Sequence, residues 1–329
     1  MKAVICTRYG APEVLQIKQV EKPKPKDNEV LIKIHASTAH VGDTRIRRAD
    51  PFLVRMVYGL FKPKKNLILG LEVSGIIEDL GKNVQSFKKG DKVFALTGFG
   101  LGAYAEYLCL PEKVKEGTQQ RKGLVAIKPE NLSFEEAAAI PAGGLTALKN
   151  LQKAKIRKGQ KILINGASGS LGTYAIQLAK YYGAEVTAVC SGKNFELVKS
   201  IGADHTIDYT KEDFTQNGIK YDVIFDTVGK SSFWGALQSL TPKGHLLLAS
   251  AGICTMLGGA ITNLFIRKNI ISGVIEETTE DMNYFKKLIE NKQLKAVIDK
   301  IYPLERIVEA YAHVDAGHKK GNVIIRMGA

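Results

Sequence analysis

Cysteine is scarce in this 329-residue chain. Only Cys6, Cys109, Cys190 and Cys254 occur, and no two of them lie within a few positions of each other. Zinc knuckles and ribbons need paired ligands, so this spacing argues against them. So few cysteines in so long a chain also argue against a disulfide framework. We therefore expect buried, reduced thiols.

Long apolar runs are also lacking. No run approaches the roughly 20 apolar residues that a membrane-spanning helix requires. The opening stretch MKAVICTRYGAPEVLQ has neither the long apolar region nor the small-residue cleavage site of a signal peptide. We expect a soluble, cytoplasmic protein without a membrane partner.

Acidic residues are outnumbered by basic ones, 33 against 47, which gives a formal net charge of +14. Such a surface could attract nucleic acid, or anionic substrates and cofactors. The lysines are spread along the chain and are not interleaved with aromatic residues, as they would be in a nucleic-acid-binding face. The charge therefore predicts a solvated basic surface, and nucleic acid is not an expected partner.

The pattern of hydrophobic residues changes along the chain. The beginning holds short alternating segments such as 30–38 and 91–97, which predict half-buried strands. From Lys161, strands and helices alternate, which is typical of a doubly wound parallel sheet. Two amphipathic helices and a closing strand at 321–327 end the chain.

The sequence thus predicts an α/β protein with a β-rich domain that is split in sequence. The expected bounds are 1–128 for its first part, 129–273 for the inserted dinucleotide-binding domain, and 274–329 for its second part. A Ser133–Glu136 capping box and Pro141 predict two helices near the first boundary, with a break at the proline. We expect Asp43 to cap the short helix that follows it.

A glycine turn stands between an apolar strand at 161–165 and a helix at 171–183. Ala167, Gly169 and Gly172 form an A-x-G-x-x-G pattern. The N-terminus of a helix offers unpaired N–H groups and the positive end of its dipole, and small residues let a pyrophosphate approach them. Because strand, turn, helix and a further strand follow one another, the pattern predicts a dinucleotide site.

The acid that usually completes such a site is missing. In NAD-binding versions a carboxylate about 20 residues beyond the glycines binds the ribose 2′-hydroxyl. Cys190 stands there instead, followed by Ser191 and Lys193. A small residue, a hydroxyl and a cation accept a 2′-phosphate that a carboxylate would repel. The sequence therefore predicts NADPH as the cofactor.

Several stretches together resemble the medium-chain dehydrogenase/reductase superfamily over nearly the full length, and its quinone oxidoreductase branch most of all. They include ILGLEVSGIIEDLGKNVQSFKKGDKVFAL, IPAGGLTAL, INGASGSLGTYAIQLAKYYGAEV and HKKGNVIIR. The resemblance implies a GroES-like β-rich domain, split in sequence, with a Rossmann domain inserted into it.

The resemblance also bears on metal binding. Zinc enzymes of this family have a cysteine where this chain has His40 and a histidine where it has Leu71. Leu71 cannot ligate zinc, so we expect no metal site. Without zinc to polarise an alcohol, reduction of an activated acceptor is the expected reaction. His40 could hydrogen-bond the nicotinamide or the substrate carbonyl, or donate a proton, or be only a polar neighbour.

The glycine turn and the resemblance together imply a set of cofactor contacts. Thr146 matches a residue near the nicotinamide in relatives, and Tyr209 one near the adenosine phosphate. The full expected set is Thr146, Ala167, Ser168, Gly169, Ser170, Leu171, Ser191, Lys193, Tyr209, Val228, Ser250, Ala251, Lys320 and Asn322.

The resulting hypothesis is an NADPH-dependent, zinc-independent oxidoreductase that transfers hydride to a quinone or an α,β-unsaturated carbonyl. A 2-enoyl thioester reductase of the same family remains an alternative. A basic RNA-binding protein that uses NADPH as a ligand is an alternative of another class. A homodimer is expected because relatives often pair their Rossmann sheets edge to edge.

Overall fold

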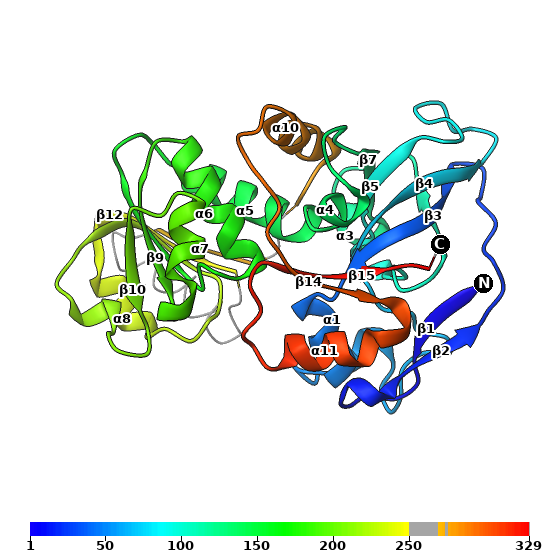
Figure 1. Ribbon diagram of the computed structural model, residues 1–329, viewed down its shortest axis with the longest axis horizontal. Helices are drawn as coiled ribbons and strands as arrows, with labels where there is room; N and C mark the ends of the chain where they lie inside the picture. Colours follow the sequence, from blue (N-terminus) through cyan, green and yellow to red (C-terminus); the bar gives the residue numbers. More distant parts are fainter. Residues whose placement is uncertain (250–268, 274–275, 329) are drawn as a thin grey trace. The chain divides into compact units, whose positions relative to one another are not determined.

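The computed structural model describes residues 1–249, 269–273 and 276–328 (Figure 1). The chain forms two compact units. The first unit comprises Met1–Ala142, Glu276–Glu290 and Ala296–Ala329, and the second comprises Gly143–Ile275 and Asn291–Lys295. These units divide the chain near 142 and 275, whereas the domain bounds at 128 and 273 stay a prediction. None of the helices in the described ranges is both long enough and apolar enough to cross a membrane.

The second unit is built on a six-stranded sheet in which every pair is parallel. The strand order is β10-β9-β8-β11-β12-β13, which is 3-2-1-4-5-6 when the strands are numbered along the chain. This is the order of the Rossmann fold, so the predicted doubly wound sheet is confirmed. The strands are β8 (Lys161–Asn165), β9 (Glu185–Cys190), β10 (His205–Asp208), β11 (Tyr221–Asp226), β12 (Leu240–Leu248) and β13 (Asn269–Ser272).

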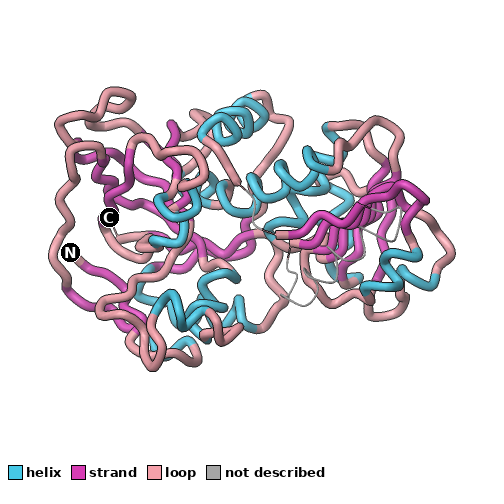
Figure 2. The backbone as a smooth tube through the Cα atoms, turned by 180° about the vertical axis from the view of Figure 1, so that it is seen from behind, coloured by secondary structure: helices cyan, strands magenta, loops and turns pink. Residues whose placement is uncertain are grey.

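The strands of this sheet form because their apolar runs are buried on both faces. Residues 162–164 of β8 and 223–225 of β11 are fully buried. Figure 2 shows helices packed alongside these strands. The helices are α5 (Pro141–Lys153), α6 (Ser170–Tyr181), α7 (Phe195–Ser200) and α8 (Phe233–Gln238).

The first unit is β-rich and is completed by the end of the chain. β15 (Asn322–Arg326) pairs antiparallel with β3 (Glu29–Thr38), so the closing strand joins the sheet of the opening segment. The sheet order is β14-β15-β3-β4-β5-β7, and β6 also pairs with β3. This pairing confirms that the β-rich domain is split in sequence. The remaining strands are β4 (Glu72–Leu80), β5 (Lys92–Leu96), β6 (Tyr107–Pro111), β7 (Leu124–Ile127) and β14 (Ile298–Pro303), with β1 (Lys2–Cys6) and β2 (Leu15–Gln19) forming a separate hairpin.

The helix boundaries at Ser133 and Pro141 fall where local chemistry predicts. The Ser133 hydroxyl accepts from the Glu136 amide, and the Glu136 carboxylate accepts from the Ser133 amide, which confirms the capping box. The predicted break at Pro141 occurs, although the proline itself opens the next helix, because a missing N–H costs nothing in the first turn. The helices are α1 (Val41–Arg48), α2 (Val54–Tyr58), α3 (Gln119–Lys122), α4 (Phe134–Ala138), α10 (Thr279–Glu290) and α11 (Ile307–Asp315).

Candidate functional site

The turn after β8 is held in a conformation that requires glycine. Gly166 has φ +80°, and a Cβ there would lie 2.4 Å from the Thr227 hydroxyl oxygen. The amides of Gly166 and Ala167 both donate to the Val189 carbonyl at 3.1 Å. These bonds fix the turn to β9 and leave α6 to begin directly behind it.

The other two glycines differ in what surrounds them. A Cβ on Gly172 would lie 2.3 Å from the Gly166 carbonyl oxygen, so this glycine lets α6 approach the turn, as predicted. A Cβ on Gly169 would meet only the Gly166 carbonyl oxygen, at an ordinary 3.4 Å. Packing therefore does not explain the glycine at the N-terminus of α6. Approach of an anionic ligand to the helix end does explain it.

Asn194 joins the glycine turn to the turn after β9. Its side-chain amide donates to the Ser168 hydroxyl at 3.0 Å and to the Ser191 hydroxyl at 3.3 Å. The residue is buried, and its Oδ1 atom has no hydrogen-bond partner among the described residues. Sequence reasoning missed Asn194, for which the only signal was its place after Lys193. It brings two predicted cofactor residues into one site.

The end of β9 carries no carboxylate. Cys190 is buried, and burial raises the pKa of its thiol to about 11, so the thiol stays neutral. The partner of Cys190 on the neighbouring strand is Asp208, whose Oδ1 accepts from the amide and the hydroxyl of Thr210 and whose carboxylate also accepts from the Gly192 amide. Lys193 is exposed. This loop therefore offers hydroxyls and a cation where NAD-binding sites offer an acid.

The carboxyl ends of β8 and β11 are tied together beside the turn. The Asn165 side-chain amide donates to Asp226 Oδ1 at 3.2 Å, and the Val228 amide donates to the same oxygen at 2.9 Å. Val228, one of the predicted contacts, is 42% exposed there. In this strand order β8 and β11 flank the switch point at which open α/β sheets bind ligands.

The remaining predicted contacts fall in different places. Thr146 lies in α5 of the second unit and is partly buried, and Tyr209 is exposed just after β10. Lys320 and Asn322 belong to the first unit. Asn322 is buried, and its backbone amide donates to the Val297 carbonyl at 2.8 Å, so it anchors the start of β15. Ser250 and Ala251 lie outside the described residues. Ala167, Ser168, Gly169, Ser170 and Leu171 form the turn and the start of α6.

His40, the predicted catalytic residue, caps α1. Its Nδ1 atom accepts a hydrogen bond from the Gly42 amide at 3.0 Å, so the neutral ring carries its proton on Nε2. Burial, together with the charges of Lys319 and Arg45, lowers the pKa of His40 to about 4. At neutral pH the ring is therefore an uncharged hydrogen-bond donor and not an imidazolium acid.

The expected cap of α1 by Asp43 was wrong. Asp43 lies within the first turn and is buried, where it accepts from the Gly70 amide at 2.9 Å and the Tyr104 hydroxyl at 2.8 Å. The Tyr104 hydroxyl oxygen also lies 2.6 Å from the Tyr311 hydroxyl oxygen, so the two side chains share a hydrogen bond. Burial raises the pKa of Asp43 to about 6. His40 caps instead because it holds the extended backbone that precedes the helix.

Glu72, which is buried, and Lys319, which is half-buried, give the first unit two more ionisable groups. Glu72 accepts from the Thr38 hydroxyl and, at 2.7 Å, from the Ala142 amide. Burial raises its pKa to about 7, and the Lys319 charge opposes the shift. Burial lowers the pKa of Lys319 to about 8, while Glu72 and Asp299 oppose that shift. The Lys319 charge acts on both His40 and Glu72, so the three groups lie within electrostatic reach of one another.

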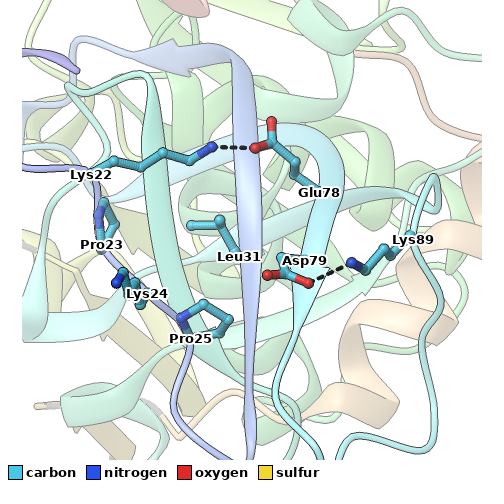
Figure 3. A pocket seen from close by; sticks show the side chains of 8 residues that line it. All are labelled: Lys22, Pro23, Lys24, Pro25, Leu31, Glu78, Asp79 and Lys89. Carbon is cyan, nitrogen blue, oxygen red and sulfur yellow. Dashed lines mark hydrogen bonds and ion pairs between the residues drawn. The ribbon is translucent and has the colours of Figure 1, made fainter.

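A hollow of about 420 Å³ on the first unit contains none of the predicted site residues (Figure 3). Lys22 pairs with Glu78 there, and Lys89 pairs with Asp79 at 2.7 Å. Because two of the three lysines that line the hollow are already paired, it offers little to an anionic ligand. Its lining is completed by Pro23, Lys24, Pro25 and Leu31.

Comparison with known proteins agrees with this geometry. Residues 26–116 match the family described as alcohol dehydrogenase GroES-like domain, and residues 201–325 match the zinc-binding dehydrogenase family. The chain is 34% identical to 2-methylene-furan-3-one reductase of Solanum lycopersicum, over 99% of this chain and 79% of that protein. The chain belongs to the medium-chain dehydrogenase/reductase superfamily, in its quinone oxidoreductase-like branch.

Solved structures of quinone oxidoreductases share the whole fold of this superfamily member. That of Coxiella burnetii superposes with a TM-score of 0.88 at 28% identity and covers 99% of both chains. That of Escherichia coli, in complex with NADPH, superposes with a TM-score of 0.81 at 26% identity and covers 99% of this chain and 100% of the other.

A match to the zinc-binding dehydrogenase family does not show that this chain has zinc ligands. Leu71, at a zinc-ligand position of the superfamily's zinc enzymes, packs against the apolar core. Within residues 1–249, 269–273 and 276–328 no three His, Cys, Asp or Glu side chains lie close enough to hold a metal ion. The absence of zinc remains a prediction for this member.

Proposed function

We propose that this medium-chain dehydrogenase/reductase uses NADPH to reduce quinones or α,β-unsaturated carbonyl compounds. The observation that carries the proposal is the pairing of an open glycine position at the start of α6 with a second strand that ends in Cys190 and not in an acid. The relatives named above, an enone reductase and two quinone oxidoreductases, support the same acceptor class.

The second unit fits the cofactor. The N–H groups at the start of α6 would hold the pyrophosphate, since Gly169 leaves room there. Ser191 and Lys193 would hold the 2′-phosphate, and Asn194 would orient the hydroxyls of Ser168 and Ser191. When bound, the cofactor supplies a hydride.

The first unit supplies groups for the acceptor. His40, neutral and protonated on Nε2, would donate a hydrogen bond to the acceptor oxygen, where negative charge develops. Lys319, with its pKa near 8, is suited to supply a proton at neutral pH, and Glu72 would tune that pKa through its charge. No nucleophile with a partnered base was predicted from the sequence, so covalent catalysis is not proposed.

Zinc independence is part of the proposal. Both oxygens of Glu72 already accept hydrogen bonds, and Leu71 offers no ligand atom. A conjugated acceptor has an electrophilic carbon without a Lewis acid, which makes a metal unnecessary for hydride transfer.

We also propose a cytoplasmic homodimer. The described cysteines Cys6, Cys109 and Cys190 are free thiols, as expected in a reducing compartment. In the described part of the sheet β13 pairs only with β12, so its other edge could pair with a second copy.

The test is a panel of acceptors assayed spectrophotometrically with NADPH and with NADH, with and without a chelator. We expect NADPH to be oxidised with quinones or short enones, at an unchanged rate in the chelator. Metal-dependent alcohol oxidation would contradict the proposal. A preference for enoyl thioesters would select that alternative, and RNA binding without reductase activity would select the other.

A further inference from the structure

The first unit exposes a group of large apolar side chains around α2. Phe61 is 87% exposed, Met56 72% and Phe52 63%. Soluble proteins seldom expose contiguous apolar patches unless the patch binds something. We call this group the apolar patch, and it consists of Phe52, Leu53, Met56, Val57, Leu60 and Phe61.

The apolar patch is presented by an anchored helix. On the inner side of α2, Val54 packs against the core, and buried Tyr58 donates from its hydroxyl to the Phe99 carbonyl at 3.2 Å. The Arg55 guanidinium lies 5.0 Å from the ring centroid of Tyr9 and 5.4 Å from that of Phe52. Because the inner residues fix α2, the outer residues Leu53, Met56 and Val57 are held toward solvent.

Three lysines follow the apolar patch directly. Lys62, Lys64 and Lys65 are exposed, and no ion pair to any of them occurs in the part of the chain that the structure describes. Asp50 is the only acidic residue between 44 and 65. An apolar surface is thus flanked by unneutralised positive charge, on a chain whose formal net charge is +14.

We propose that the apolar patch and its three lysines dock this protein on the surface of an anionic lipid bilayer. Apolar and aromatic side chains enter the headgroup region, and adjacent lysines are attracted to anionic headgroups. The long lysine stems can lie along the bilayer while their ammonium groups stay in water. The proposal is independent of the reductase activity.

Two other occupants fit less well. A symmetric dimer through this surface would place the same lysines against each other, which costs free energy. Single-stranded RNA would use the aromatic rings and the lysines, but the aliphatic members Leu53, Met56, Val57 and Leu60 offer no platform on which a base can stack. A bilayer uses both the aliphatic and the aromatic members of the patch.

This proposal changes the expectation of no membrane partner. That expectation depended on the lack of a long apolar run, which bears on crossing a bilayer. Surface docking needs only a short apolar face with flanking charge.

The experiment is co-sedimentation of the full chain with two kinds of vesicle, phosphatidylcholine alone and phosphatidylcholine with phosphatidylserine. We expect binding to the anionic vesicles to be at least about tenfold tighter and to weaken with salt. Phe52→Ser with Phe61→Ser should reduce it about tenfold or more, whereas Trp234→Ser, which removes a 62% exposed aromatic side chain from the second unit, should not.

Charge variants test the second part of the proposal. Replacing Lys62, Lys64 and Lys65 by glutamine should abolish the preference for phosphatidylserine, since each lysine near the surface strengthens binding about fivefold. The matched control replaces the exposed Lys113, Lys115 and Lys122 of the same unit and should leave the preference intact.

Three results would overturn the proposal. The first is equal binding to both vesicles, or binding that is unchanged in the phenylalanine variant. The second is self-association in sedimentation velocity, or binding of an RNA oligonucleotide, that the same variants abolish while vesicle binding persists. The third is loss of activity with a water-soluble quinone together with unchanged vesicle binding, which would assign the patch to the acceptor. Failure of the reductase assay for the unaltered chain leaves the vesicle result unaffected.

Discussion

The candidate sites of the two units are built from different kinds of chemical groups. In the second unit the candidate site consists of backbone amides, small residues and hydroxyls, and the nearby Cys190 is buried and neutral. In the first unit the candidate groups His40, Glu72 and Lys319 are ionisable, and burial shifts the pKa of each. The contrast suggests that shape governs nucleotide binding, whereas proton balance governs the step at the acceptor.

The largest expected effect is on the shape of the nucleotide site. Gly169→Val should raise the Kd for NADPH about 100-fold or more, because the added side chain occupies the approach to the helix end. Stability should fall by only about 1 kcal/mol, the usual cost of an unfavourable N-cap residue, since φ of Gly169 is −81° and a Cβ there meets no close neighbour. Calorimetry and thermal unfolding measure both quantities.

Gly172→Val is the matched control for this prediction. Its Cβ would lie 2.3 Å from the Gly166 carbonyl oxygen, so it should lower stability as well as binding. If Gly169→Val destabilised the chain as much as Gly172→Val, the distinction between a ligand-facing and a packing glycine would be wrong.

The second effect concerns the choice of cofactor. Lys193→Glu should weaken NADPH binding about 30-fold and leave NADH binding nearly unchanged, because a charge-assisted contact to the 2′-phosphate is lost. Lys199→Glu, which makes the same charge change at an exposed position at the end of α7, should have a much smaller effect. Equal losses of NADPH affinity in the two variants would mean that Lys193 acts only through the overall charge of the surface.

The third effect sharpens the contrast in proton chemistry. The kcat/KM for the acceptor should fall as pH rises through about 8, where Lys319 loses its proton. Lys319→Met should flatten this limb of the profile and lower the plateau about tenfold. Lys300→Met, at an exposed position of β14, should retain both the limb and the plateau. If Lys319→Met altered the Kd for NADPH instead, Lys319 would belong with the nucleotide site.

The smallest effect is on stability in acid. The pKa of His40 is lowered from 6.5 to about 4 in the folded chain, so the unfolded chain binds more protons between these values and stability falls as pH drops through them. His40→Asn, which can still cap α1, should remove about 1 kcal/mol of that loss over the first pH unit below 6.5.

Chemical unfolding of both proteins across this pH range measures the difference. Asp43 and Glu72 have raised pKa values and contribute with the opposite sign, but they are present in both proteins and cancel. Parallel curves for the two proteins would show that His40 titrates normally.

Local patterns predicted the scaffold well. The strand–turn–helix at 161–181 and the missing acid at Cys190 are readable because the relevant residues are close in sequence. The candidate site was predicted less completely. Asn194 bridges Ser168 and Ser191 across 26 and 3 positions, and the Tyr104–Tyr311 contact spans 207 positions. Contacts of this kind depend on tertiary packing, which a periodic pattern does not encode.

Asp43 illustrates the same limit at one residue. Aspartate before a short helix favours a cap, yet here its carboxylate accepts from Gly70 and Tyr104 in the interior. The N-cap preference of aspartate correctly indicated that Asp43 accepts hydrogen bonds from N–H and O–H groups. It was wrong about which residues donate them.

The two donors to the Glu72 carboxylate have a consequence for protein engineering. An experimenter could introduce cysteine at position 40 and histidine at position 71 to install zinc. Each oxygen of Glu72 accepts one hydrogen bond, from the Thr38 hydroxyl and from the Ala142 amide, and keeps a lone pair that could ligate a metal ion. Because these donors already fix the direction of the carboxylate, the two introduced ligands would have to meet zinc's tetrahedral geometry around a third ligand that is held in place.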